Sequence, residues 1–283
     1  MGTLSFLARR FVAGETLEEG IDAVRTLNVG GVMATLDVLG ENVSNEREVE
    51  AAAASYIELL RAIGRAKIQS NVSLKLTQMG LDIGEDYCLG VMRRIVAEAM
   101  QHNNFVRIDM EGSAYTERTL HLFQELYSKF PNGVGIVLQS YLHRSEEDAR
   151  KMALLRAPVR VCKGAYKEPT SIAYQDMDDI RRSYRSMVEV LLKGGSHVGI
   201  ATHDERLLRW VVEWTGKENV PRSQFEFQML YGLRRKRARE LASQGYAVRS
   251  YVPFGTHWLP YFVRRLRERK ENIFFVLKSL VTD

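Results

Sequence analysis

The chain is poor in cysteine, having only Cys88 and Cys162 among its 283 residues. These two cysteines are far apart and fit no metal-ligand spacing, which argues against a disulfide framework and against a zinc module. No apolar run is long enough to cross a bilayer, and the segment 1–12 is too short and too charged for a signal peptide. We therefore expect a cytoplasmic protein in a reducing compartment, and any contact that it makes with a membrane could only be peripheral.

The sequence also lacks the common phosphate-binding loops. No Gly-x-Gly-x-x-Gly follows the first apolar run and no Walker-type loop is present, which argues against a doubly wound dinucleotide-binding domain. Six prolines and 21 glycines leave no room for a long disordered linker, and 45% hydrophobic with 27% charged residues is ordinary for a globular protein. The net charge of +5 suits anionic ligands without requiring them.

What the sequence does contain is a series of eight short apolar runs rich in β-branched residues. They span 32–38, 71–76, 105–110, 135–139, 159–162, 198–202, 225–230 and 248–252. Amphipathic helical patterns lie between them, for example at 46–66, 87–101, 117–130, 146–155 and 206–214. Eight strand-helix units predict an α/β fold, a closed parallel (βα)8 barrel of the TIM type, as one domain over 1–283. A doubly wound open sheet is the alternative.

Several of the predicted strands carry polar side chains that need a partner or a purpose inside a barrel. Strand alternation puts Ser73 and Lys75 on one face of their run, and Arg107 and Asp109 on one face of the next. We place six more polar residues late in their strands: Gln139, Arg160, Thr202, Glu226, Gln228 and Tyr251. Catalytic residues of such barrels lie at the carboxyl ends of the strands, so we expect these side chains to converge on a positively charged mouth that binds a small anion.

A second cluster of polar residues lies near the C-terminus. On a helix, Tyr261, Arg264, Arg265 and Glu268 fall along one stripe because their offsets are 0, 3, 4 and 7. Two adjacent guanidinium groups can hold a carboxylate, and Glu268 lies one turn beyond Arg264, where it can keep that fork aimed. The alternative is an amphipathic helix with a solvated basic face.

The segment that follows the fifth run is the other dense region. Gly164 and Ala165 would let the backbone approach a planar ring or a phosphate, while Lys163 supplies positive charge. An ordinary strand-helix turn is the alternative interpretation. His203, after the sixth run, could bind a metal, but the surrounding cations favour a histidine that is hydrogen-bonded to a cofactor or to the backbone.

Taken together in their order along the chain, these segments resemble the proline dehydrogenase family of flavin enzymes. The segments that carry the resemblance are Ser73–Leu76, Ile108–Glu111, Val137–Gln139, Arg160–Tyr166, Ala201–His203, Phe225–Leu230, Tyr251–Thr256 and the stripe from Tyr261 to Glu268. Each segment alone is weak evidence, whereas the set of eight in this order along the chain is specific.

The resemblance implies a distorted (βα)8 barrel with FAD over its mouth and extra terminal helices. It implies oxidation of L-proline to Δ1-pyrroline-5-carboxylate, the first step of proline degradation to glutamate, with hydride transfer from proline C5 to flavin N5. Electrons would pass to a membrane quinone. The chain is too short for the aldehyde dehydrogenase module of bifunctional relatives, so a separate pyrroline-5-carboxylate dehydrogenase would use the product. No nucleic acid partner is expected.

The resemblance also assigns roles to residues. Arg264 and Arg265 would bind the proline carboxylate with Lys75, and Glu268 would support them. Tyr261, Tyr251, Leu230 and Tyr166 would enclose the proline ring, and Asp109 would order the polar groups beside it, so that Asp109, Tyr166 and Tyr251 form the catalytic set. The residues assigned to FAD are Met110, Gln139, Arg160, Lys163, Gly164, Ala165, Thr202, His203 and Gln228, with Glu226 behind them. No metal is assigned.

Two other classes of function stay open on the sequence alone. A metal-dependent barrel lyase or isomerase acting on a small carboxylate would use Asp109, Glu111, His203 and Glu226 as ligands. A non-catalytic barrel that binds anions or nucleic acid would rely on the basic tract 234–239 and on the last helix. That tract lacks interleaved aromatic residues, so a solvated helix face is the better interpretation of it.

Overall fold

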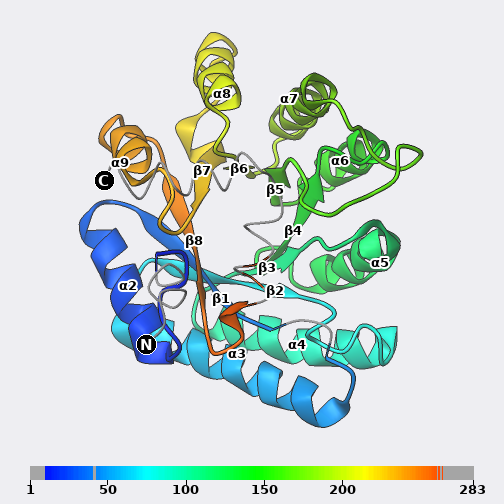
Figure 1. Cartoon of the computed structure of the whole chain (residues 1–283), viewed down its shortest axis with the longest axis vertical. Coiled ribbons are helices and arrows are strands. Elements are labelled where there is room, and N and C mark those ends of the chain that lie inside the picture. The colour runs from blue at the N-terminus through cyan, green and yellow to red at the C-terminus, as the bar shows by residue number, and fades with distance from the viewer. Residues whose placement is uncertain (1–9, 41–42, 260, 262, 264–283) are drawn as a thin grey trace.

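The computed structural model describes residues 10–40, 43–259, 261 and 263, and these residues form a closed barrel of eight parallel strands surrounded by helices (Figure 1). The strands are β1 (Met33–Val38), β2 (Ser70–Lys75), β3 (Val106–Asp109), β4 (Val134–Gln139), β5 (Val159–Cys162), β6 (Val198–Ala201), β7 (Phe225–Leu230) and β8 (Val248–Phe254). Each strand pairs with the next, and β8 closes the barrel on β1. The predicted fold class is confirmed, because all eight predicted runs form strands.

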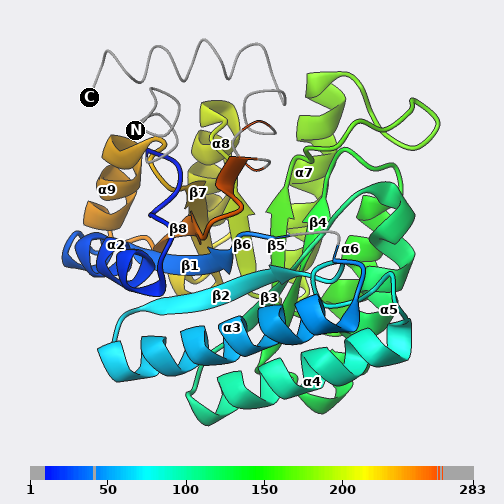
Figure 2. The same cartoon turned by 60° about the horizontal axis from the view of Figure 1, so that its bottom comes forward.

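Helices cover the outside of this barrel and alternate with the strands (Figure 2). They are α2 (Leu17–Val29), α3 (Glu46–Ala66), α4 (Glu85–Gln101), α5 (Ser113–Lys129), α6 (Ser145–Leu154), α7 (Met177–Lys193), α8 (Glu205–Lys217) and α9 (Arg235–Ser243). The predicted helical ranges correspond to α3, α4, α5, α6 and α8. The expected extra helices at the chain ends fall mainly on residues 1–9 and 264–283, which lie outside the described residues.

Local sequence explains where these helices begin and which face they bury. In α3, the buried residues Val49, Tyr56 and Ile63 repeat at the spacing of one helix face, and the Asn45 side chain accepts a hydrogen bond from the Glu48 N–H at the start. Thr16 and Glu19 form a capping box at the start of α2. Within the described residues, no helix is long and apolar enough to span a membrane.

The strand alternation predicted from the sequence is confirmed. Val72 and Leu74 of β2 are fully buried and belong to the apolar core that packs under the helices. The residues that alternate with them, Ser73 and Lys75, take part in polar contacts inside the barrel. Branched apolar side chains usually fill the interior of such barrels. Polar side chains in that place must be hydrogen-bonded or paired with an opposite charge, because burying them without a partner costs free energy.

At the floor of the barrel lies an ion pair between Glu226 and Arg249. The Arg249 guanidinium donates from Nε to Glu226 Oε1 at 2.6 Å and from Nη2 to Oε2 at 3.0 Å. Burial opposes ionisation of Glu226, but Arg249 outweighs it and the pKa of Glu226 falls to about 2. The expectation that Glu226 lies late in its strand is wrong, because it is the second residue of β7. Alternation in a strand fixes the face of a side chain but not its depth in the barrel.

We predict that Glu226→Ala lowers the free energy of unfolding by about 3–5 kcal/mol near neutral pH, because it leaves the Arg249 guanidinium buried without a counterion. The folded pKa near 2 lies below the ordinary value of 4.5, so the stabilisation is present above that ordinary value and is lost as the pH falls toward 2. Urea unfolding of wild type and variant at neutral and acidic pH measures both effects. The exposed residue Glu213 provides a control, Glu213→Ala. An unfolding difference that does not shrink in acid would contradict the assignment.

Candidate active site

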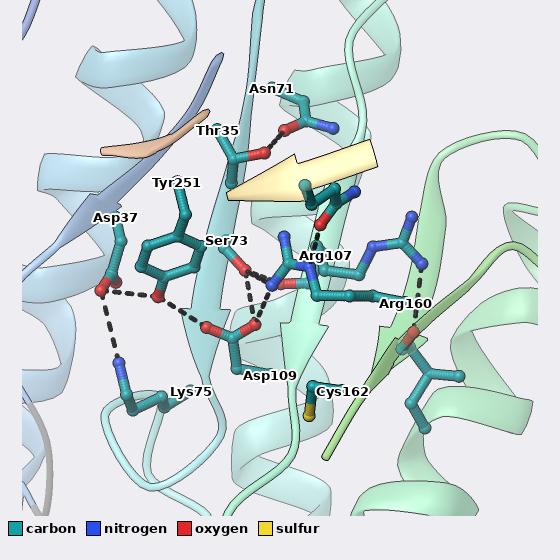
Figure 3. A network of polar contacts seen from close by, with 12 residues as sticks. Thr35, Asp37, Asn71, Ser73, Lys75, Arg107, Asp109, Arg160, Cys162 and Tyr251 are labelled. Atoms are coloured by element: carbon teal, nitrogen blue, oxygen red, sulfur yellow. Dashed lines mark hydrogen bonds and ion pairs between the residues drawn. The ribbon is translucent and has the colours of Figure 1, made fainter. Parts of the chain in front are cut away.

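Side chains from four strands meet around the carboxylate of Asp109, the last residue of β3 (Figure 3). Asp109 Oδ1 accepts hydrogen bonds from Arg160 Nη1 at 2.6 Å and from Ser73 Oγ at 2.7 Å. Asp109 Oδ2 lies 2.8 Å from the hydroxyl oxygen of Tyr251. The expectation that Lys75, Asp109, Arg160 and Tyr251 converge inside the barrel is confirmed by these contacts and by the Lys75 pair described below.

Arg160 of β5 joins this cluster to the floor. Its Nε donates to Gln228 Oε1 at 2.5 Å, and Gln228 Nε2 donates to Glu226 Oε1 at 2.6 Å. Its guanidinium also stands over the Tyr251 ring, 5.3 Å from the ring centre. Within the described part of the chain, Arg160 Nη2 has no hydrogen-bond partner. A rigidly held donor is thus left for a ligand.

Asp37 of β1 belongs to the same cluster, although sequence reasoning did not single it out. It is fully buried, and its Oδ2 lies 2.8 Å from the Tyr251 hydroxyl and 3.5 Å from Lys75 Nζ. Burial raises the pKa of Asp37, and the charge on the nearby Asp109 raises it further. The charge on Lys75 lowers this pKa but offsets only part of the rise. A single acid within the predicted strand 32–38 was the available signal.

Burial and the two neighbouring carboxylates also raise the pKa of Tyr251 well above its ordinary value. Its phenol therefore stays protonated across the pH range in which proteins work. Lys75, at the end of β2, is 9% exposed, and its position next to Asp37 agrees with the prediction that it points into the barrel.

The segment after β5 is fixed by a second group of charges. Lys163 Nζ lies 3.2 Å from Asp204 Oδ2, and Arg181 Nε donates to the same oxygen at 2.8 Å. Burial alone would raise the pKa of Asp204, but the hydrogen bonds and charges of Arg181 and Lys163 lower it to about 2. Asp204 also caps α8 by accepting from the Arg206 N–H. Its ion pairs were not predicted.

Gly164 gives this segment a backbone path that other residues cannot follow easily. Its φ is +113°, and a Cβ at this position would overlap the ring of Tyr141. Ala165 and Tyr166, which follow it, are partly exposed. Further along, Glu168 accepts hydrogen bonds from the Ser113 N–H and Oγ, each at 2.7 Å, so the segment is tied to the start of α5.

His203 makes the backbone contact that the sequence favoured. Its Nε2 accepts a hydrogen bond from the Leu230 N–H, with 3.0 Å between the two nitrogen atoms. Nε2 therefore carries no proton of its own, and the proton of the neutral imidazole ring lies on Nδ1. Thr202 Oγ1 accepts from the Asp204 N–H at 3.1 Å. These bonds fix the loop ends after β6 and β7.

The four candidate ligands of the metal-dependent alternative are held by separate partners. Glu111 accepts from Thr77 Oγ1 at 2.7 Å, while Asp109, Glu226 and His203 have the partners given above. Among the described residues, no group of three or more histidine, cysteine, aspartate or glutamate side chains is placed to hold a metal ion. The geometry therefore gives no support to the lyase or isomerase alternative.

The remaining predicted residues lie in different settings. Met110 and Gln139 are buried, and Gln139 Nε2 donates to the Glu111 carbonyl at 2.8 Å. Leu230 is partly buried, and Tyr261 is 8% exposed and packs with Val12 and Leu39. Arg264, Arg265 and Glu268 lie outside the described residues, so their assignment stays a prediction.

Comparison with known proteins decides the family. A family model described as proline dehydrogenase matches residues 21–278. The chain belongs to the proline dehydrogenase family. It is 41% identical over 274 residues to proline dehydrogenase 1 of Bacillus subtilis, and this match covers 97% of this chain and 90% of that protein. It is 40% identical over 279 residues to the proline dehydrogenase of Deinococcus radiodurans, with the same two shares covered.

A solved structure shows the same fold. The proline utilization A protein of Bdellovibrio bacteriovorus, inactivated by N-propargylglycine, matches with a TM-score of 0.88 and 25% sequence identity. The match covers 95% of this chain but 33% of the other, so this chain spans about a third of that longer protein.

Proline dehydrogenases are flavin enzymes, and the residues around the barrel mouth fit such a cofactor. A flavin ring presents hydrogen-bond acceptors on its edge, and Arg160 Nη2 is a donor without a partner in the described chain. Gly164 brings the backbone close to the mouth, and the neighbouring residue Lys163 provides a positive charge. This set of donors suits an anionic dinucleotide with a planar ring.

We predict that Gly164→Ala lowers both stability and flavin content. The positive φ costs alanine on the order of 1–3 kcal/mol, and the added methyl group must also displace the Tyr141 ring. Gly216→Ala in α8 is the matched control, since its Cβ would meet nothing within 4 Å. Thermal unfolding and the ratio of flavin to protein absorbance measure the effect. Equal values for both variants would show that the backbone path at Gly164 is unimportant.

Proposed function

We propose that this chain oxidises L-proline to Δ1-pyrroline-5-carboxylate with FAD as its cofactor, in the first step of proline degradation to glutamate. The observation that carries the proposal is the network of Lys75, Asp109, Arg160 and Tyr251 at the barrel mouth, in which Lys75 and Arg160 are buried and the other two are partly buried. Near full-length identity of about 40% to proteins named proline dehydrogenase supports it.

Bound FAD would supply the acceptor for the proline C5 hydride at its N5 atom and would pass the electrons on to a membrane quinone. The protein's contribution is to bind and to orient. Arg160, held by Asp109 and Gln228, would donate to the flavin from Nη2, and Lys163 would stabilise negative charge on the ring. The other residues proposed to hold FAD are Met110, Gln139, Gly164, Ala165, Thr202, His203 and Gln228, with Glu226 supporting Gln228 from below.

The substrate would be fixed in the site through its carboxylate group. We assign the binding of this group to Lys75 together with Arg264 and Arg265, and Glu268 would keep the Arg264 guanidinium aimed. Lys75 is nearly buried, so its contact with a carboxylate would be stronger than a contact in water. Tyr166, Leu230, Tyr251 and Tyr261 would enclose the ring, which turns a random encounter into a fixed approach of C5 to the acceptor.

Asp109 would act mainly by ordering its neighbours. Its oxygens already face Arg160, Ser73 and Tyr251, so it fixes the direction of a guanidinium and of a phenol beside the substrate. The described residues contain no histidine among the side chains that contact Asp109 or Tyr251. We therefore assign the loss of the amine proton to water, along a path arranged by Asp109 and Tyr251.

The proposed electron acceptor, a membrane quinone, has a consequence for where the protein works in the cell. A membrane quinone requires access to a bilayer, and we propose a cytoplasmic enzyme that associates peripherally with the inner membrane. The product would be taken by a separate pyrroline-5-carboxylate dehydrogenase.

The visible spectrum of the purified protein tests cofactor, substrate and reaction together. We expect a flavin spectrum that bleaches when L-proline is added without oxygen and is restored by a soluble quinone. D-proline serves as the control for stereochemistry. A colourless protein, or a yellow one that L-proline does not bleach, would refute the proposal.

We predict that Arg264→Ala and Arg265→Ala each raise the KM for proline roughly ten- to a hundredfold, because a charge-assisted contact contributes about 1.5–3 kcal/mol. Flavin content should stay unchanged. Arg209→Ala, at an exposed position of α8, provides the matched control. Steady-state kinetics measure the change, and a KM near the wild-type value in both variants would remove these arginines from the substrate site.

A further inference from the structure

The phenol of Tyr251 lies between two carboxylates but carries one proton. Its oxygen is 2.8 Å from Asp37 Oδ2 and 2.8 Å from Asp109 Oδ2 (Figure 3). We propose that Asp37 is protonated in the working enzyme and is a positioning residue, which acts through Tyr251 and Lys75 on the binding of proline. This inference rests on the proposed function and adds a residue to its site.

The two contacts of the Tyr251 hydroxyl need more protons than the phenol can supply. Two oxygen atoms at hydrogen-bond distance need a proton between them, since two lone pairs facing each other at this distance repel. The row from Asp37 through Tyr251 to Asp109 has two such contacts and therefore needs two protons. Tyr251 supplies one, so the second must reside on a carboxyl group.

The surroundings decide which carboxyl group holds it. Asp109 receives Arg160 Nη1 at 2.6 Å and Ser73 Oγ at 2.7 Å, and both contacts stabilise its anion. Asp37 is fully buried, and the ammonium group against it, Lys75 Nζ, stays at 3.5 Å. The neutral acid is thus favoured at Asp37, which would donate to Tyr251 while Tyr251 donates to Asp109.

The groups that face Asp37 come from three strands and one helix, and one further cation lies behind them. They are Lys75 of β2, Asp109 of β3, Tyr251 of β8 and Tyr56 of α3, with Arg160 of β5 beyond Asp109 and the Tyr251 ring. Burial raises the pKa of Asp37 and Asp109 adds to the rise, which agrees with the proton count.

A neutral Asp37 has two consequences for the substrate. A neutral Asp37 does not compensate the positive charge of Lys75, so this charge can act on the proline carboxylate. It also fixes the phenol in one direction, with its proton toward Asp109. If Asp37 lost its proton, its charge would attract both the Lys75 ammonium and the phenolic proton, and proline would bind less tightly.

Asp37→Asn and Asp37→Ala test the proposal. The asparagine amide can still donate to Tyr251, so we expect this variant to keep kcat and KM within a few-fold of wild type. Alanine leaves Tyr251 without its donor, and we expect KM to rise about tenfold with flavin content retained. Because the pKa of Asp37 is raised, the wild-type acid is neutral below that pKa and ionises above it, so any alkaline rise in KM due to Asp37 must be absent from Asp37→Asn.

Infrared difference spectra give a readout that a purely structural role would not move. Wild type minus Asp37→Asn should show the carbonyl stretch of a protonated carboxyl group near neutral pH. Asp148 of α6 is a buried residue whose carboxylate pairs with Arg144. The difference spectrum of wild type minus Asp148→Asn should show no such band. A missing band in the Asp37 difference spectrum, or an asparagine variant as impaired as the alanine variant, would overturn the proposal. Bleaching of wild type by proline tests the proposed function separately.

Discussion

The ion pair between Arg160 and Asp109 is the interaction on which the rest of the interior depends. Both partners lie inside a barrel, where an isolated charge would cost several kcal/mol, so each must be neutralised and hydrogen-bonded. Arg160 meets this condition by contacting Asp109, Ser73, Gln228 and the Tyr251 ring, which come from four other strands. A single guanidinium therefore fixes the relative positions of five strands at the mouth.

From this pair a continuous row of polar contacts runs through the barrel. Toward the floor it passes through Gln228 to Glu226 and Arg249, and toward the mouth through Asp109 and Tyr251 to Asp37 and Lys75. Such a row is rigid because its polar groups satisfy one another in an interior of low dielectric constant. The proposed chemistry needs this rigidity, since a hydride would pass between two bound molecules whose alignment the protein must provide.

Much of this arrangement could be predicted from the sequence, and the misses have physical causes. Parallel strands buried on both faces read as short apolar runs, so all eight could be located, and alternation correctly put Lys75 and Asp109 inside. Glu226 was placed too near the mouth because alternation carries no information about depth. Asp37 and the ion pairs of Asp204 depend on side chains more than twenty residues away in the sequence, which no local pattern reveals. Arg264, Arg265 and Glu268 lie outside the described residues, so the sequence and the family resemblance carry their assignment.

The connection from β5 to α7 is attached to the rest of the barrel at two separate places. Glu168 accepts hydrogen bonds from the first residue of α5. Beyond it, Leu142 and Ala173 form a short antiparallel bridge, flanked by backbone hydrogen bonds from the His143 N–H to the Ile172 carbonyl and from the Tyr174 N–H to the Tyr141 carbonyl. An insertion before Glu168 would shift Lys163 and Gly164 at the mouth, and one after it would disturb the bridge. Loop length in this connection is therefore expected to vary little among relatives.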